Sequence, residues 1–363
     1  MLWRGAADPE VAPVLPRTLA ALATWDGRGL PGEAAFAALA ADIRQARADG
    51  TLASAATRLN YDVNGFRSLL FSTGRRLPAE GATDLAAAFK AIAPAWGERE
   101  TWAAIRRAGG PVTDLYLLNA LDLRRDADGA IVATPPDQAV FRTVLVRTLW
   151  IALVVTVVSL ALGYPAAYLL ARLPERLANP LLILILVPFW TSLLVRTAAW
   201  VVLLQREGVV NAFLARLGLT AEPLPMIYNR FAVYVAMVHI LLPFMILPLY
   251  SVMRGIPAAH LRAAASLGAR PLTVFRRVFL PQSAAGVAAG SLLVFIQALG
   301  YYVTPALVGG AEDQMISYFI AFYASRTINW GMAATLSLLL VAATAALFLV
   351  YRRLAGGHMP RVA

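Results

Sequence analysis

Five long apolar stretches in the second half of the chain constrain its fold more than any other feature. An α-helix needs about 20 apolar residues to cross the hydrocarbon core of a membrane. The stretches are 143–171, 180–204, 231–253, 284–308 and 331–351. The five acidic residues after residue 141 all fall between these stretches, as expected from the cost of placing a carboxylate in lipid. The sequence therefore predicts an all-α integral membrane protein with five visible transmembrane helices.

Charge divides the chain into two parts. Residues 1–141 hold 15 basic and 16 acidic residues, whereas residues 142–363 hold 17 basic and only 5 acidic ones. Because the basic part is also the apolar part, a soluble nucleic-acid-binding protein is a poor fit. The chain has no cysteine, which excludes disulfides, thiolate catalysis and cysteine-based metal sites.

The arginines between the apolar stretches predict an orientation in the membrane. Segments 172–179 and 254–281 and the residues after 351 carry ten Arg, whereas 205–230 and 309–330 carry four. Because short cytoplasmic loops are enriched in Lys and Arg, we expect a bacterial inner-membrane protein with a cytoplasmic tail, 354–363. Residues 1–141 are then extracytoplasmic. Residues 1–4 do not form a signal peptide, so we expect a sixth, N-terminal span upstream of this sequence.

The N-terminal part, 1–141, reads as a helical domain. Residues Glu33–Ala48 place apolar side chains on one face at helical spacing. Similar patterns recur at 82–93 and 101–108. The acidic residues are scattered at positions expected to face water, so we interpret this domain as structural, without a catalytic constellation.

The loop 255–282, between the third and fourth stretches, is too long and too regular for a simple connector. Residues 258–267 favour a helix, and Gly268 follows where a helix can end in a left-handed residue. Pro271 can begin a second helix, in which Leu272, Phe275, Val278 and Phe279 form an apolar stripe. Two interpretations remain open from the spacing alone: a bracket that docks in another protein, or a basic loop that only sets topology.

At this point the residues resemble a known family. The loop is similar to the EAA motif of ATP-binding-cassette (ABC) importer permeases, with Arg262-Ala263-Ala264, then Gly268, then Phe279-Leu280-Pro281. The resemblance extends over roughly 141–353 and is most similar to the spermidine/putrescine-type permeases in the strings at 162–174, 188–200, 241–250 and 299–310. Two features depart from the family: Arg262 replaces the motif's Glu, and the usual first span is absent from these residues.

The resemblance implies a transmembrane permease subunit, with residues 142–353 as its membrane domain and 254–282 as its cytoplasmic coupling loop. Its partners would be a cytoplasmic ATPase dimer, a second permease subunit, an extracytoplasmic solute-binding protein and a small solute such as a polyamine. ATP and Mg would bind to the ATPase, because this chain has no phosphate-binding loop, so we expect no cofactor, metal or catalytic residue here. The expected coupling residues are Arg262, Ala263, Ala264, Gly268, Leu280 and Pro281.

Several residues within or between the apolar stretches are candidates for the solute pathway, which the resemblance implies works by alternating access. Arg196 is the one charge well inside a stretch, and an uninterrupted helix would place it about 24 Å from Pro180, close enough to the interface to snorkel. The aromatic candidates are Trp190, Tyr301, Tyr302 and Tyr323, although aromatic residues also belong at membrane interfaces. His239 is interpreted as a packed core residue.

Pro243 and Pro248 lie in the stretch that leads into the loop, where they predict a hinge. The main alternative function is a secondary carrier or channel not coupled to an ATPase. Proton-coupled carriers use carboxylates or histidine inside the bilayer, and no apolar stretch here contains a carboxylate.

Overall fold

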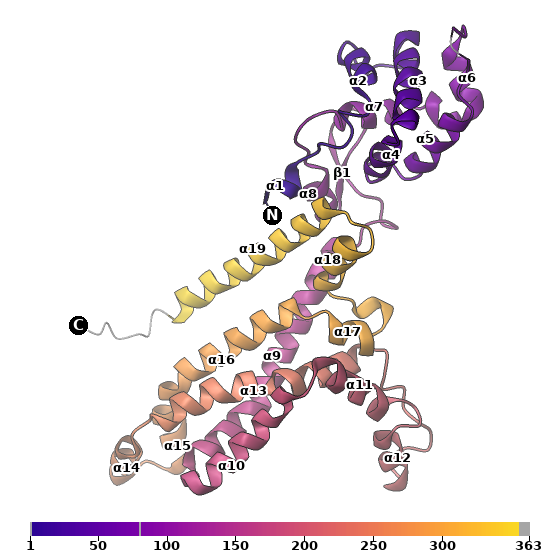
Figure 1. The fold of residues 1–363 in the computed structure, drawn as a ribbon. Coiled ribbons are helices and arrows are strands. Elements are labelled where there is room, and N and C mark those ends of the chain that lie inside the picture. Colours follow the sequence, from indigo (N-terminus) through magenta and orange to yellow (C-terminus); the bar gives the residue numbers. More distant parts are fainter. Residues whose placement is uncertain (1, 80, 356–363) are drawn as a thin grey trace. The chain divides into compact units, whose positions relative to one another are not determined.

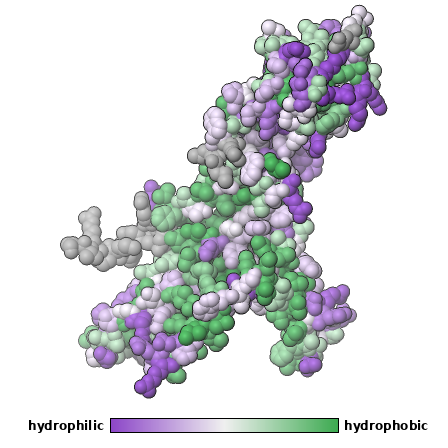
Figure 2. All heavy atoms as spheres, viewed as in Figure 1, coloured by the Kyte–Doolittle hydropathy of each residue, from purple (hydrophilic) through white to green (hydrophobic). Residues whose placement is uncertain are grey.

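The computed structural model describes residues 2–79 and 81–355, and the predicted tail lies outside them except for residues 354–355. The chain divides into two compact units. The N-terminal unit comprises Met1–Arg142 together with Asn329–Thr335, and the membrane unit comprises Thr143–Ile328 and Leu336–Ala363. Figure 2 shows apolar residues gathered over the helices of the membrane unit and hydrophilic residues on the N-terminal unit.

The N-terminal unit is mainly helical (Figure 1). Its elements are α1 (Leu2–Ala6), α2 (Pro16–Ala23), α3 (Glu33–Ala48), α4 (Leu52–Asn60), α5 (Phe66–Arg75), α6 (Leu85–Ile92), the 3₁₀ turn Pro94–Gly97, α7 (Arg99–Arg107), α8 (Leu115–Ala120), β1 (Leu123–Arg125) and β2 (Ile131–Ala133). The three predicted helical patterns correspond to α3, α6 and α7. The antiparallel hairpin β1–β2 was not anticipated.

Aromatic side chains form the core of the N-terminal unit. Phe36 contacts Trp102 edge-on, with 4.5 Å between ring centroids, and Phe89 contacts Trp96 at 5.5 Å. The indole nitrogen of Trp96 donates to the Thr73 hydroxyl at 2.8 Å. These four rings are fully buried, so the unit has a hydrophobic core of its own.

Two long helices begin inside the N-terminal unit. The buried carboxylate of Asp122 accepts three backbone N–H groups at 2.7–3.0 Å, from Val140, Phe141 and Arg142, and so caps the start of α9 (Phe141–Arg172). The first turn of α19 (Trp330–Ala355) is capped by Asn329. It packs so closely that a side chain at Gly331 would collide with the Tyr116 ring.

The membrane unit contains the remaining elements. They are α10 (Glu175–Leu186), the 3₁₀ turn Val187–Trp190, α11 (Leu193–Leu204), α12 (Val209–Arg216), α13 (Arg230–Arg254), α14 (Ala258–Ser266), α15 (Pro271–Val274), the π-helix Phe275–Phe279, α16 (Leu280–Gly300), α17 (Val303–Val308), the 3₁₀ turn Ala311–Asp313 and α18 (Ile316–Ser325).

Close packing around α13 organises the membrane unit. A Cβ atom at Gly286 or Gly290 of α16 would lie 3.2 Å or less from the backbone of α13, and one at Gly163 of α9 would lie 2.9 Å from Met245. Small residues at these positions let the helix backbones approach each other, as is common inside membranes. The helix α13 is therefore the central helix against which α9 and α16 pack.

The prediction of five apolar helices long enough to cross a membrane is confirmed for the described residues, but two boundaries are wrong. The stretch 180–204 is not one helix, because Pro188 and the extended residues Thr191 and Ser192 separate α10 from α11. The second segment of membrane-spanning length is instead Leu193–Arg216, which comprises α11 and α12 with the turn 205–208 between them. The stretch 284–308 is also divided: α16 ends at Gly300 and α17 is separate.

Candidate functional site

The segment 255–282, which we name the coupling segment, forms the predicted helix–glycine–helix bracket. Its first helix, α14, ends at Ser266, and two residues later Gly268 has a φ of +81°, the left-handed conformation that glycine adopts without strain. The Gly268 N–H donates to the Ala265 carbonyl and the Ala269 N–H to the Ala264 carbonyl, at 3.0 and 3.2 Å. This pair of hydrogen bonds is a Schellman cap, so the bend is fixed by its own backbone.

Aromatic contacts join the second half of the coupling segment to α9. The Tyr168 ring lies edge-on to Phe279 at 4.9 Å and to Phe275 at 5.6 Å. The Arg172 guanidinium stacks over Tyr168 at 4.3 Å. The Tyr164 hydroxyl lies 2.9 Å from the Ser283 hydroxyl at the start of α16. Phe279 is almost fully buried, so the aromatic stripe predicted from sequence anchors the segment.

Two polar contacts hold the ends of the segment. The guanidinium of Arg254, the last residue of α13, donates to the Ala171 and Leu173 carbonyls and pairs with Glu175, all at 3.2 Å. The His260 ring nitrogen lies 2.9 Å from the Gln282 side-chain oxygen and so joins α14 to α16. The lone histidine of α14 gave no sequence signal for this contact, because its partner is 22 residues away.

The expected coupling residues lie on the outside of the segment. Arg262, Ala263, Gly268, Leu280 and Pro281 are exposed, Ala264 is partly buried, and α14 contains no buried residue at all. Among the large apolar side chains of the described residues, the most exposed is one that was not predicted as a coupling residue: Leu267, at the tip of the bend, is 88% exposed. Leu272, assigned from sequence to the apolar stripe, is 61% exposed and does not join the anchoring rings.

A second group of side chains, which we name the polar membrane cluster, joins α11 and α13 to the end of α16. It consists of Arg196, Trp200, His239 and Tyr301. The Trp200 indole N–H donates to His239 Nδ1 at 3.2 Å, and the two rings lie edge-on at 5.5 Å. Arg196 precedes Trp200 by four residues on α11 and so lies on the same face of that helix. The Trp200 and Tyr301 side chains pack against the same hydrophobic core.

The cluster corrects two interpretations. His239 is exposed in this chain and bonded to Trp200, so it is not a packed core residue, because apolar neighbours in the sequence lie on other faces of α13. The depth of 24 Å for Arg196 assumed an unbroken helix and does not hold, since the break at 187–192 places Arg196 in the first turn of α11.

The other predicted pathway and hinge residues lie on separate elements. Trp190, in the 3₁₀ turn, is 78% exposed, and Tyr302, before α17, is 44% exposed. Tyr323 lies on α18 against Phe322. Pro243 and Pro248 both lie inside α13, which continues as a helix through them, and their role as a hinge stays a prediction.

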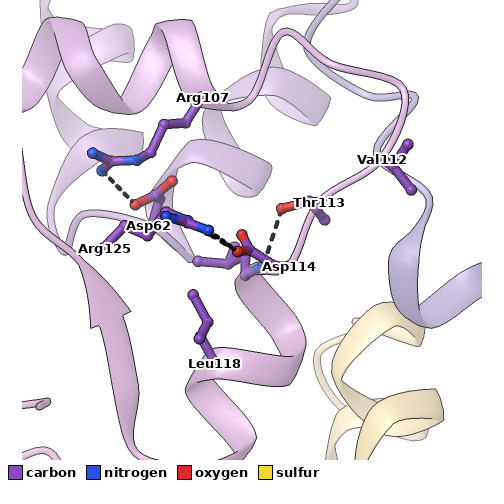
Figure 3. A pocket seen from close by; sticks show the side chains of 8 residues that line it. Asp62, Arg107, Val112, Thr113, Asp114, Leu118 and Arg125 are labelled. Carbon is purple, nitrogen blue, oxygen red and sulfur yellow. Dashed lines mark hydrogen bonds and ion pairs between the residues drawn. The ribbon is translucent and has the colours of Figure 1, made fainter. Parts of the chain in front are cut away.

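A pocket of about 430 Å³ lies in the N-terminal unit, between α7, α8 and β1. Figure 3 shows two ion pairs along it, Arg107 with Asp62 at 2.9 Å and Arg125 with Asp114 at 2.6 Å. Burial works to lower the pKa of Arg107, but the carboxylates of Asp62 and Glu100 outweigh it and raise that pKa. The charged side chains around this pocket are therefore paired with one another. The described residues contain no group of three potential metal ligands.

Comparison with known proteins shows what the chain is similar to. The sequence profile of the family described as "Binding-protein-dependent transport system inner membrane component" matches residues 143–363. The spermidine/putrescine transport system permease protein PotB of Escherichia coli K12 is 38% identical over 210 residues, covering 58% of this chain and 76% of that protein. The PotB protein of Salmonella typhimurium SL1344 is 37% identical, covering 58% and 73%.

More distant relatives share the same region. The molybdenum transport system permease protein ModB of Mycobacterium bovis is 32% identical over 217 residues, covering 60% of this chain and 79% of that protein. Among solved structures, a chain of the bacterial alginate ABC transporter in complex with its periplasmic protein superposes with a TM-score of 0.50. It covers 59% of this chain and 78% of the other at 15% identity, which supports the fold alone.

Proposed function

The chain belongs to the family of binding-protein-dependent transport system inner membrane components, and from this premise we propose that it is the permease of an ATP-driven importer for a polyamine or a similar small organic compound. The solute class is suggested by relatives that are 37–38% identical over 210 residues and are named for spermidine and putrescine. The membrane unit would carry the solute by alternating access.

The coupling segment is the observation that carries this proposal. A docking element must be exposed at its tip and firmly joined to the helices that it moves. The helix α14 has no buried residue, whereas Phe279 is buried against α9 and Arg254 binds the carbonyls at the end of α9. A push on α14 would therefore reach α9, α13 and α16 together.

The proposed assembly has three kinds of partner. A cytoplasmic ATPase dimer would receive α14 and would bind ATP and Mg, whereas this chain would bind neither. A second permease subunit would complete the pathway. A solute-binding protein would deliver the solute on the extracytoplasmic side, where we place the N-terminal unit, with the C-terminus in the cytoplasm.

The test is to reconstitute the chain with its partner ATPase, second permease and binding protein, and to measure ATP hydrolysis with and without loaded binding protein. We expect loaded binding protein to stimulate hydrolysis and Leu267→Asp to reduce that stimulation about tenfold, because a charge at the exposed tip weakens docking. Leu219→Asp is the matched control, since Leu219 is 66% exposed but lies outside the coupling segment.

Two results would contradict the proposed function or the role of the coupling segment. Uptake that follows a pH gradient without ATP would indicate a secondary carrier and would overturn the proposal. Equal loss in the two leucine variants would show that the coupling segment has no special role in docking.

A further inference from the structure

The guanidinium of Arg196 has no carboxylate to balance it. The sequence contains no Asp or Glu from 138 to 174, from 176 to 206 or from 223 to 311, which covers nearly all of α9, α10, α11, α13 and α16. Among the described residues no ion pair includes Arg196, and its Nε is buried without a hydrogen-bond partner. A charge in a transmembrane segment normally pairs with another group or marks a substrate pathway.

The position of the cluster along α13 places it within the apolar length of the helix. His239 lies nine residues after Arg230, so at 1.5 Å per residue it is about 14 Å along the helix from that end. Arg230 itself pairs with Asp313 at 2.9 Å. A lipid tail cannot satisfy a guanidinium, an imidazole and a phenol, so contact with lipid would be costly for this cluster.

The groups in the cluster are mainly hydrogen-bond donors. Because His239 Nδ1 accepts the Trp200 N–H, the neutral imidazole carries its hydrogen on Nε2, which is then a donor. The Tyr301 hydroxyl and the Arg196 guanidinium also donate. In addition, Arg196 stands in the first turn of α11, where the helix dipole adds positive potential. This set suits an acceptor that carries negative charge.

We infer that Arg196, Trp200, His239 and Tyr301 form a pathway site for an anionic group of the solute, with a carboxylate as the simplest case. The inference rests on the proposed import function and narrows the class of solute. Among polyamines and similar small organic compounds, it selects solutes that carry a carboxylate, whether or not they also carry an amine. The Trp200 and Tyr301 rings pack along the carbon chain of the solute, and Arg196 forms the ion pair.

The first experiment measures binding directly, so that it does not depend on import. The full chain, purified in nanodiscs, is titrated with 4-aminobutanoate, succinate and putrescine while tryptophan fluorescence is recorded, and a Trp200→Phe variant identifies the signal of Trp200. The probes share a four-carbon chain and differ in their charged ends. We expect the two carboxylates to change Trp200 fluorescence, putrescine to leave it unchanged, and Arg196→Gln to abolish the response. A response to putrescine alone, or none to the carboxylates, would falsify the inference.

The second experiment uses the reconstituted complex. We expect Arg196→Gln to lower ATP-dependent uptake of 4-aminobutanoate relative to putrescine about tenfold and Arg196→Lys to restore part of it, while Arg206→Gln, an exposed loop control, changes neither. Two results would overturn the solute site: an equal loss of uptake for both solutes, or loss of the second permease from the purified Arg196→Gln complex. Either result would indicate that Arg196 pairs with a carboxylate of the second permease and not with the solute. Absence of any ATP-dependent uptake would contradict the proposed function, whereas the fluorescence titration would still decide the inference.

Discussion

At the scale of single residues, Gly268 holds the bend of the coupling segment with a backbone angle that L-residues adopt at a cost of about 1–2 kcal/mol. A Cβ atom there would meet nothing within 4 Å. Any effect of a substitution therefore comes from the backbone conformation and not from a clash.

This geometry leads to a prediction for two variants. Gly268→Val should lower the ratio of native to non-native bend conformations roughly 5- to 30-fold. We therefore expect ATP hydrolysis to be uncoupled from uptake, while the amount of protein in the membrane stays normal. Gly268→Asn should be nearly silent, because asparagine tolerates the left-handed region. The measurement is uptake per ATP hydrolysed, and equal coupling in both variants would show that the bend is not required.

The left-handed conformation of Gly268 could be predicted from the sequence, because a helix cap depends only on residues near it in the chain. The sequence was not sufficient for His239, whose partner Trp200 lies on another helix, or for Asp122, which caps α9 from a left-handed φ of +54°. The contacts of such residues depend on which elements pack together, and spacing along one chain does not contain that information.

At the scale of elements, apolar content predicted where the chain enters the membrane better than where its helices end. The break between α10 and α11 falls at Pro188, inside the stretch 180–204 that was predicted as one span. The π-helix Phe275–Phe279 was unexpected. It directly precedes α16, and its two phenylalanines form the contacts with α9, so tertiary packing accompanies the local geometry.

The contact between α13 and α16 gives the element-scale prediction. Gly286→Leu should destabilise the membrane unit by about 1–3 kcal/mol or more, because the new side chain meets the backbone of Pro248 and Leu249, which cannot rotate away. Gly300→Leu is the matched control on the same helix, with no atom within 4 Å of its Cβ. Thermal unfolding in detergent compares the two, and equal melting temperatures would contradict close packing at Gly286.

At the scale of the whole molecule, the absence of cysteine makes the proposed orientation directly testable. Ser68 of α5 and Ser266 of α14 are both exposed, and we place them on opposite sides of the membrane. In intact cells a membrane-impermeant maleimide should label Ser68→Cys, whereas Ser266→Cys should react only after permeabilisation. The reverse pattern would invert the orientation, and labelling of both in intact cells would contradict it.

The composition of the N-terminal unit has a consequence for biosynthesis. Its last segment, Asn329–Thr335, packs Gly331 against Tyr116 but is translated only after the whole of 143–328. At about 5–20 residues per second, the ribosome needs about 10–40 s for that interval. During this time the surface around Tyr116 is without its final covering, so this unit emerges before residues 143–328 but is completed only after them. Its completion marks the arrival of α19.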